Sequence, residues 1–287
     1  MRPGFRIVHK PVGATSFSLV RAAMDEAASL GLSKQLKVVH GGALDPFAEG
    51  LVLLALGEAT KLVDLVHEAP KRYRATIAWG IETDTGDPLG KPIAHGDASA
   101  LTQAKLDSTL AKFLGWHEQV PPATSNKRVD GERAYEKAHR GEAVELPASR
   151  VYLHAAHFIN ANTLELTCRG GFYVRSLVRD LGRALCVPAH LPALERTAIG
   201  PWTKPGEVVG EALVPWLPAR VLDDDEAIAV EQGRPISLGT LAPPSWTLAS
   251  YPMPESPIRG LYRGKLMAML EKRGERLERT CELRGGV

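Results

Sequence analysis

The sequence predicts an α+β protein, and two kinds of apolar spacing lead to that class. Apolar residues recur three and four positions apart in 16–30 and 101–114, which is typical of helices with one buried face. In contrast, every second residue from Tyr73 to Trp79 is apolar, as in a half-buried strand. Helical and strand segments follow one another along the chain, so a domain with both a sheet and helices is expected.

Local signals set the order of these elements. Ser16 is a residue type that caps helices, and the apolar positions from Leu19 to Ala27 share one helix face. The unbroken apolar run Leu51–Leu56 is too short for a typical helix and predicts a buried strand. The remaining elements, in chain order, are a helix over Glu58–Glu68, the strand Tyr73–Trp79, a turn from Gly80 to Asp87, a helix over Leu101–Leu114, a strand over Leu164–Cys168 and a helix over Tyr173–Leu185.

The chain of 287 residues is long enough for one large domain and one small one. Its apolar fraction of 44% excludes a globally disordered protein. A Pro-rich segment at 205–220 marks a shift in composition, so we predict a larger domain over residues 1–215 and a small one over 216–287. A second Pro-rich stretch, at 243–257, predicts a long surface connection within the small domain.

Composition also predicts the compartment. The longest apolar run is Leu51–Leu56, which is too short to span a membrane, and the first ten residues lack the apolar core of a secretory signal. The three cysteines do not form a C-x-x-C pair, which argues against a disulfide framework or a zinc knuckle. We therefore expect a cytoplasmic protein.

The formal net charge of +2 conceals an uneven distribution of charge. Residues 207–231 carry seven acidic side chains and one basic side chain, whereas residues 259–287 carry eight basic and four acidic ones. The total alone argues against a nucleic-acid partner, but binding depends on where the charge is placed. The rest of the chain keeps a small positive excess, so a local basic surface is compatible with the sequence.

The most informative segment for function is His40–Leu51. It begins with His40 and two glycines, continues with Asp45 and Pro46, and ends in an apolar run that predicts a strand. A residue before proline is driven out of the helical region, so Asp45 is presented from a turn rather than from a helix face. The strand that follows anchors this turn against the core. Taken alone, these residues favour a structural Asx-Pro turn over a catalytic loop, and the decision depends on the segments that accompany them.

Those segments resemble, in order, the TruB family of tRNA pseudouridine synthases. The central match is Gly42-x-Leu44-Asp45-Pro46-x-Ala48-x-Gly50-Leu51, followed by Gly57-x-Ala59-Thr60-Lys61. The other matches are His9-Lys10-Pro11-x-Gly13-x-Thr15-Ser16, Lys71-x-Tyr73, Gly80-x-x-Thr83-Asp84-Thr85-x-Asp87, Gln119-x-Pro121-Pro122, Ser125-x-Lys127 and Cys168-x-x-Gly171-x-Tyr173-x-Arg175-Ser176-Leu177-x-x-Asp180-Leu181-Gly182. One such match arises by chance, but an ordered series across residues 7–200 identifies the chain as similar to this family.

The resemblance implies a pseudouridine-synthase fold, with a mixed, largely antiparallel central sheet flanked by helices and a small PUA-like β domain at the C-terminus. It implies isomerisation of the T-loop uridine of tRNA, conventionally numbered 55. The C1′–N1 bond breaks, the uracil turns and a C1′–C5 bond forms, which requires neither an organic cofactor nor a metal. The target base is stacked in a folded loop, so it must be flipped into a pocket.

Three residues match the family's catalytic positions. Asp45 matches the aspartate that acts on the ribose, either by attacking C1′ or by removing a proton at C2′. Arg175 matches the arginine that pairs with it, because a bidentate guanidinium keeps a carboxylate ionised and oriented. Tyr73 matches the tyrosine expected to stack on the flipped uracil. Outside the family, Arg175 is equally compatible with a solvated helix face, and Tyr73 with an ordinary strand aromatic.

Further residues are candidates for RNA binding. His40 matches a family histidine that helps to hold the opened T-loop, and Tyr173 matches a tyrosine beside the pocket. A loop histidine without a role and a core tyrosine are the plain alternatives. Lys71, Arg72 and Arg74 flank Tyr73 and predict a basic patch beside a stacked base.

Two more groups of candidates lie near the entry of the predicted cleft. Lys10 matches a family position there, where a structural role is equally compatible. Residues 119–149 resemble an insertion that closes over the T-arm, and Lys127 and Arg128 within it are expected to contact RNA unless they merely solvate a helix face. The chain departs from the family here, because Thr124-Ser125-Asn126 stands where Tyr-Ser-Ala is usual.

Other functional classes remain open. A non-catalytic module that grips the tRNA elbow or assists RNA folding needs the same basic surface but has no turnover. A glycosidic hydrolase attacks the same bond but needs a second carboxylate as general acid, and no candidate stands out. Within the synthase class, the insertion and the absence of a Lys-rich tail favour a stand-alone, bacterial-type monomer. Such an enzyme acts on the tRNA T-arm stem-loop without a guide RNA or an obligatory protein partner.

Overall fold

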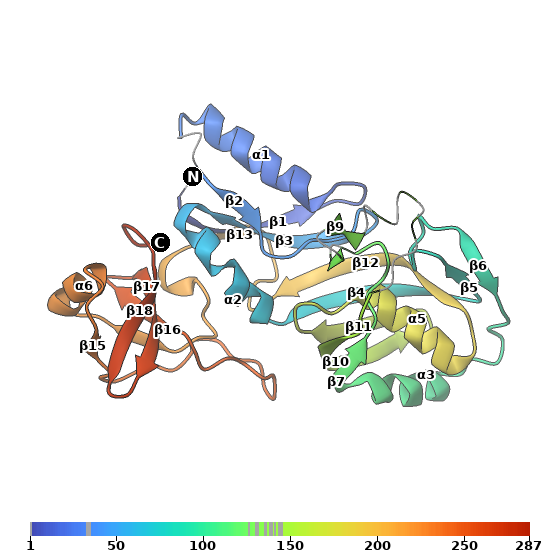
Figure 1. The fold of residues 1–287 in the computed structure, drawn as a ribbon. Helices are drawn as coiled ribbons and strands as arrows, with labels where there is room; N and C mark the ends of the chain where they lie inside the picture. The colour runs from blue at the N-terminus through green and yellow to red at the C-terminus, as the bar shows by residue number, and fades with distance from the viewer. Residues whose placement is uncertain are drawn as a thin grey trace.

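The computed structural model describes residues 2–32, 36–125, 127–129, 132–134, 137, 140, 142 and 146–287, with the backbone alone at 128, 129 and 133. Within these residues the main element is a nine-stranded sheet (Figure 1). From one edge to the other its strands are β13 (Gly206–Val208), β1 (Gly4–Lys10), β3 (Glu49–Leu56), β12 (Ala189–Ile199), β4 (Lys71–Trp79), β11 (Thr163–Cys168), β10 (Ser149–Asn160) and β7 (Gly115–Gln119), while β2 (Val38–His40) pairs with β3 outside this order.

Antiparallel pairing dominates the sheet, and the exception lies at its centre. Among the described strands of this sheet, β12 and β3 alone pair in parallel, through Glu195 with Glu49 and Arg196 with Gly50. Gly50 permits this approach, because a Cβ there would lie 2.4 Å from the carbonyl oxygen of Arg196, and its φ is +107°. The parallel pairing therefore brings the start of β3 directly onto Arg196.

Three helices cover one face of the sheet. They are α1 (Ser16–Ser29), α3 (Gln103–Leu110) and α5 (Val174–Leu185). Their buried residues pack on inward side chains of the strands in one core. Thr15, not the predicted Ser16, caps α1, because the Thr15 side chain accepts a hydrogen bond from the Ser18 amide. Ser16 is buried and has a different role, described below.

The opposite face is covered by a second core around β1 and β3. It includes the fully buried Trp216, together with Leu62 and Val66 from the segment that follows β3. That segment was predicted as one helix over 58–68. It is instead a 3-10 helix, η1 (Gly57–Leu62), followed by a short α-helix, α2 (Val63–Glu68). The run Leu51–Leu56 is confirmed as strand, buried on both faces because each face of β3 meets a core.

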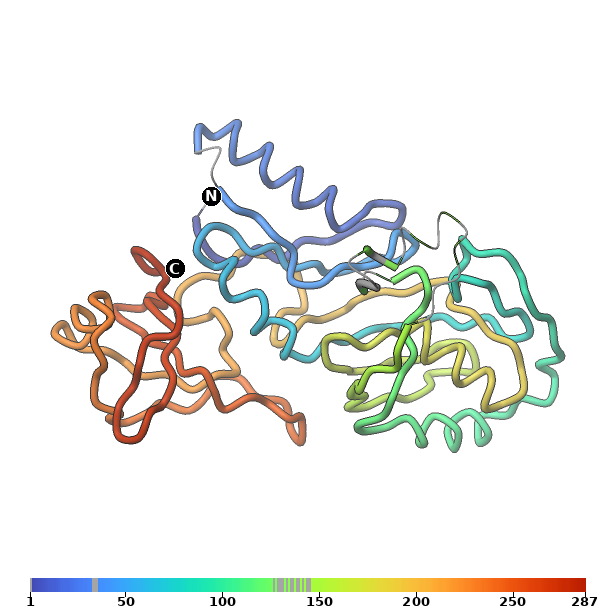
Figure 2. The backbone as a smooth tube through the Cα atoms, in the orientation of Figure 1, coloured from blue at the N-terminus to red at the C-terminus, as the bar shows by residue number. Residues whose placement is uncertain are grey.

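Residues beyond the main sheet form a smaller, five-stranded sheet, drawn in orange and red in Figures 1 and 2. Its described strands, in order, are β14 (Ala219–Val221), β16 (Ile258–Tyr262), β17 (Lys265–Arg273), β18 (Arg276–Glu282) and β15 (Ile236–Ser237). Helix α6 (Asp224–Glu231) packs beside it. Four of the seven acidic side chains of residues 207–231, at 223–226, form the capping box and first turn of α6, where negative charge stabilises a helix N-terminus.

Short elements complete the described structure. The predicted helix over 101–114 is α3 extended by η2 (Ala111–Phe113), and η3 (Gly210–Ala212) follows β13. The hairpins are β5 (Ile81–Thr83) with β6 (Pro92–His95), and β8 (Arg128–Val129) with β9 (Glu132–Arg133). Across the described residues, no helix has the length and apolarity needed to cross a membrane.

Candidate active site

Asp45 lies in the loop between β2 and β3, and backbone contacts hold this loop in place. The Leu44 amide donates to the buried Ser16 hydroxyl at 2.8 Å, so the start of α1 fixes the residue before Asp45. The Gly13 amide donates to the Pro46 carbonyl at 2.8 Å and fixes the residue after it. The Asp45 carboxylate is therefore presented from a rigid turn, as the Asp-Pro pair predicted.

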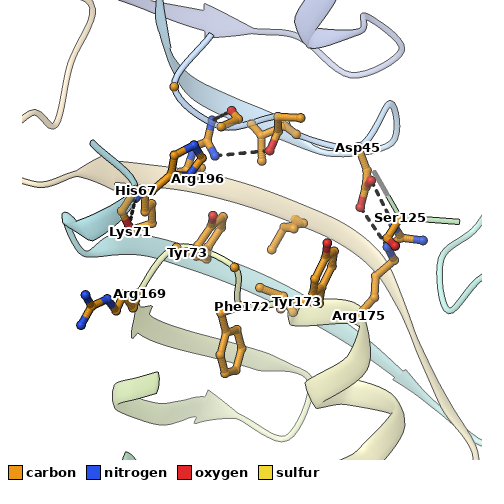
Figure 3. A pocket seen from close by; sticks show the side chains of 18 of the residues that line it. Asp45, His67, Lys71, Tyr73, Ser125, Arg169, Phe172, Tyr173, Arg175 and Arg196 are labelled. Carbon is orange, nitrogen blue, oxygen red and sulfur yellow. Dashed lines mark hydrogen bonds and ion pairs between the residues drawn. The ribbon is translucent and has the colours of Figure 1, made fainter. Parts of the chain in front are cut away.

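Arg175 binds that carboxylate through one hydrogen bond and one further ion-pair contact (Figure 3). Its Nε lies 2.9 Å from Oδ2 of Asp45 and its Nη2 lies 3.0 Å from Oδ1. The Arg175 side chain is only 4% exposed, which excludes the alternative of a solvated helix face, whereas the Asp45 side chain is 35% exposed. A buried, bidentate guanidinium thus orients a carboxylate that still faces an open cavity.

The remaining nitrogen of Arg175 is also fully engaged. Its Nη1 donates to Oδ2 of Asp87 at 3.1 Å, to the Thr85 carbonyl at 3.0 Å and to the Thr124 hydroxyl at 2.6 Å. Asp87 is itself buried, and its other oxygen accepts hydrogen bonds from the Thr85 hydroxyl and the Leu89 amide. Arg175 is therefore fixed between two carboxylates, although the sequence analysis assigned no role to Asp87 or Thr124.

A cavity of about 360 Å³ opens beside Asp45, within the size range of about 300–1,000 Å³ that is usual for small-molecule sites. Tyr73 from β4 and Tyr173, just before α5, both line it, and their rings point in the same direction in Figure 3. Gln119 holds the Tyr173 backbone, accepting from its amide at 2.8 Å and donating to its carbonyl at 3.1 Å. Leu194 and Phe172 supply apolar walls, so a planar ring with a polar edge suits this cavity.

Arg196 is a further cavity residue, and the sequence analysis did not identify it. It is 3% exposed, and its guanidinium donates to the carbonyls of Leu51 at 2.6 Å, Gly42 at 3.0 Å and Ala43 at 3.5 Å. It thereby links β12 to both ends of the Asp45 loop. The sequence did contain a signal for this residue. Alternation along the strand places Arg196 on the same inward side as Leu194, and an arginine at a buried position is rare enough to suggest a functional role.

Lys71 lies at the far end of the cavity from Asp45 (Figure 3). It is buried, and its Nζ donates to the carbonyls of Val66 at 2.6 Å, Ala69 at 2.8 Å and His67 at 3.0 Å. These carbonyls lie at the C-terminal end of α2, where a cation is favourable. Burial nevertheless lowers the pKa of Lys71 to about 7, with the nearby Arg196 charge acting in the same direction.

Burial dominates the electrostatics of the other ionisable groups. It raises the pKa of Asp45, and the charge of Asp87 raises it further, while the Arg175 and Lys10 charges oppose this rise. Burial likewise raises the pKa of Tyr73, so this phenol stays neutral at ordinary pH. The cavity thus combines one carboxylate with several cationic side chains.

The other residues predicted to contact RNA lie in different surroundings. His40 lines this cavity and also an adjoining one of about 790 Å³ on the α1 side of Asp45. Lys10 is fully buried, and its Nζ donates to the carbonyls of Pro11 and Ala14, so its contacts favour the structural role. Lys127 donates to the Ser149 hydroxyl. The side chain of Arg128 lies outside the described residues.

The predicted basic patch around Tyr73 is wrong in its geometry. Successive side chains of a strand point to opposite faces, so Tyr73 faces the cavity while Arg72 and Arg74 face away from it. Arg74 is also neutralised there by Glu165 at 2.9 Å and Glu195 at 3.9 Å. Within the described residues, no group of three or more His, Cys, Asp or Glu side chains is arranged to hold a metal ion.

Comparison with other sequences identifies close relatives. Residues 31–174 match the family described as TruB family pseudouridylate synthase (N terminal domain). The chain is 35% identical over 293 residues to the tRNA pseudouridine synthase B of Rhodospirillum rubrum, covering 93% of this chain and 91% of that protein. It is 39% identical over 214 residues to the protein of the same name from Xanthomonas campestris pv. campestris, covering 73% and 68%.

Solved structures resemble the whole chain. The Cbf5–Nop10–Gar1 complex contains a chain that superposes with a TM-score of 0.66 at 20% identity, covering 98% of this chain and 84% of that one. An H/ACA RNP bound to a substrate RNA containing 2′-deoxyuridine contains another, with a TM-score of 0.65 at 19% identity. At such identities the likeness concerns the fold alone, and it confirms the predicted fold class.

Proposed function

The chain belongs to the TruB family of pseudouridylate synthases, and from that premise we propose that it isomerises uridine 55 in the T-loop of tRNA to pseudouridine. The observation that carries the proposal is the bidentate pair of Arg175 and Asp45, with its carboxylate open to a cavity that also holds Tyr73. The relatives that share most of its length are tRNA pseudouridine synthases by name. This is a reaction within one nucleotide, so it needs no group transfer to water.

Each of the cavity residues has its own role in the proposed reaction. A flipped uracil enters beside Tyr73 and Tyr173, whose rings provide a stacking surface. The C1′–N1 bond breaks, the base turns within the cavity and C5 bonds to C1′, after which the proton leaves C5 and N1 is protonated. Asp45 acts on the ribose in its ionised form, whether it attacks C1′ or removes the C2′ proton. Arg175 holds it at the correct angle.

The cationic lining has a chemical consequence for the detached base. Breaking the C1′–N1 bond leaves negative charge on the uracil, and the cations that line the cavity include Arg196 and the protonated form of Lys71. Fixed positive charges in a partly dry site stabilise such charge as it develops. The apolar walls from Leu194 and Phe172 keep water from the reacting atoms, which favours re-attachment of the base over its loss.

The test uses unmodified tRNA labelled with tritium at C5 of uridine. We expect tritium release to water with one pseudouridine formed per tRNA, and no release from tRNA whose residue 55 is cytidine. Asp45→Asn should lower the single-turnover rate by at least about 10³-fold, roughly 4 kcal/mol of barrier, while tRNA binding is retained. Binding without any tritium release by the native protein would instead indicate a non-catalytic tRNA-binding module, and free uracil would indicate hydrolysis.

We also propose that the enzyme acts alone in the cytoplasm, without a guide RNA. The relatives that cover most of this chain are named for a tRNA substrate, whereas the structural neighbours that were solved in complexes are only about one-fifth identical. A bare T-arm stem-loop distinguishes the two modes. Turnover of this stem-loop by the purified chain supports the proposal, and a requirement for added RNA or protein contradicts it.

A further inference from the structure

An exposed tryptophan lies at the edge of the main sheet, close to the cavity. Trp116 on the edge strand β7 is 44% exposed, and its ring centroid lies 5.0 Å from that of Tyr152 on β10. Nothing in the proposed chemistry at Asp45 uses this ring.

Two guanidinium groups lie over the same indole. The Cζ of Arg150 is 4.8 Å from the ring centroid of Trp116, and the Cζ of Arg169 is 5.6 Å from it. Arg169 also lines the cavity, and in Figure 3 its guanidinium points away from Asp45 at the far end. Arg169 is therefore shared by the cavity and by the surface around Trp116, although strand alternation places Trp116 and Tyr152 on the face of the sheet opposite to Tyr73.

The inner side of this surface is held rigidly. Tyr152 makes ring contacts with Tyr251, 5.8 Å between centroids, and Tyr251 also contacts His154 at 5.5 Å. The Tyr251 hydroxyl donates to the Glu68 carbonyl at 3.0 Å, and Arg169 pairs with the Glu68 carboxylate. The Pro-rich segment of the small domain thus supports Tyr152 from one side, while Trp116 stays 44% exposed beside its two arginines.

We propose that Trp116, Arg150, Tyr152 and Arg169, here called the Trp116 platform, bind one nucleotide of the RNA substrate outside the cavity. A neighbour of the flipped uridine stacks on the indole, and its phosphate pairs with Arg150. Stacked bases and phosphates are the two features that aromatic rings and guanidinium groups recognise in unpaired RNA. This inference rests on the proposed function, because it needs an RNA whose uridine occupies the cavity.

The first test measures RNA affinity and turnover separately. Trp116→Ala should raise the Kd for the T-arm stem-loop by about 5- to 150-fold, the equivalent of one base–aromatic stack, and leave the single-turnover rate at saturating RNA unchanged. Trp116→Phe should keep most of the affinity, because it keeps a ring. Leu114→Ala is the matched control, since Leu114 is two residues away and equally exposed at 44%.

The second test concerns charge. Arg150→Ala should reduce the slope of log Kd against log salt by about 0.7 to 0.9, the value for one lost phosphate contact. Lys105→Ala removes an exposed cation from α3 and should not change it. If Trp116→Ala lowers the melting temperature, Trp116→Leu replaces it, because leucine retains apolar contact with Tyr152 but offers no ring.

The outcomes separate this inference from the proposed function. If the native protein modifies tRNA while Trp116→Ala and Trp116→Leu bind RNA as Leu114→Ala does, the platform is rejected and the function stands. If the native protein forms no pseudouridine but Trp116→Ala still loses RNA affinity, the platform stands and the function is rejected. Loss of saturating rate with unchanged Kd in folded Trp116→Ala also overturns the platform as a binding surface.

Discussion

Asp87 holds the Arg175 guanidinium on the edge that Asp45 does not use, with 3.1 Å between Oδ2 of Asp87 and Nη1 of Arg175. Asp87 is 5% exposed and its second oxygen is occupied by the Thr85 hydroxyl and the Leu89 amide, so it has little freedom to move. The orientation of Asp45 is therefore set by a chain of contacts that starts in the turn after β5. Asp87 is a positioning residue, because it acts through Arg175.

Asp87→Asn is expected to lower the single-turnover rate by about 10- to 100-fold with little change in RNA affinity. An amide cannot match the charge of Arg175, so the guanidinium rotates and Asp45 leaves its productive position, and small misplacements cost rates of this order. Single-turnover kinetics and filter binding on the same stem-loop measure the two effects. Thr124→Val is the comparison, because it removes another hydrogen bond from Nη1 without changing charge. An equal loss in both variants argues against a special role for the carboxylate.

The pH dependence of kcat/KM provides a second prediction. The proposed mechanism needs ionised Asp45, and burial raises the pKa of this group, so activity should fall on acidification at a pH above about 3.9, where an ordinary aspartate titrates. The Asp87 charge also raises that pKa. Asp87→Asn should therefore move the acid limb to lower pH where Arg175 keeps its contact with Asp45, and to higher pH where the guanidinium rotates away, so the direction of the shift reports the position of Arg175. Asp84→Asn removes an exposed carboxylate from the same turn and should leave the limb in place.

The sequence predicted the strands and helices around this site better than the contacts between them. Alternation and apolar runs identified β3, β4 and α5, because burial on one or two faces determines which positions are apolar. The partnership of Asp45 with Arg175 spans 130 positions and came only from family resemblance, since no local spacing encodes it. The error at Arg72 and Arg74 arose from treating sequence neighbours of Tyr73 as spatial neighbours, which a strand forbids.

Thr124 shows a second reason why contacts within the site could not be predicted from the sequence. Its departure from the family pattern was visible in the sequence, but its consequence depends on which side chain lies opposite. The structure places its hydroxyl 2.6 Å from Nη1 of Arg175, so the departure reaches the pair of Asp45 and Arg175 and not only the loop that is expected to grip RNA. A hydrogen bond between residues 51 positions apart has no signal in composition or periodicity.

Arg196 is expected to affect both stability and rate. Arg196→Met leaves the Leu51 and Gly42 carbonyls without their donor, which should lower the free energy of unfolding by about 1–3 kcal/mol for each. The same change frees the loop that carries Asp45, so the saturating rate should fall while RNA affinity changes little. Arg196→Lys should recover part of the rate, because it restores one donor and the charge.

Urea denaturation and single-turnover kinetics, both at a temperature where each variant is folded, check this prediction. Thr197→Val is the control, since Thr197 follows Arg196 on β12 and its hydroxyl donates outside the cavity, to the Arg72 carbonyl at 3.3 Å. If Arg196→Met is destabilised but keeps the native rate, then Arg196 supports the fold without positioning Asp45.

Lys71 makes the stability of the protein depend on pH in an unusual direction. Its pKa is about 7 in the folded protein and about 10.4 when unfolded, so between these values the unfolded chain binds one more proton. The unfolding free energy should therefore increase with pH in this interval, by at most about 1.4 kcal/mol per pH unit.

Lys71→Met lacks this titration, so the stability of the native protein relative to this variant should increase from pH 7 to pH 10. Urea denaturation of both proteins at three pH values measures this difference. Lys112→Met, at an exposed lysine of η2, should show no such trend, and a constant difference for Lys71→Met would mean that the buried ammonium stays protonated on its three carbonyls.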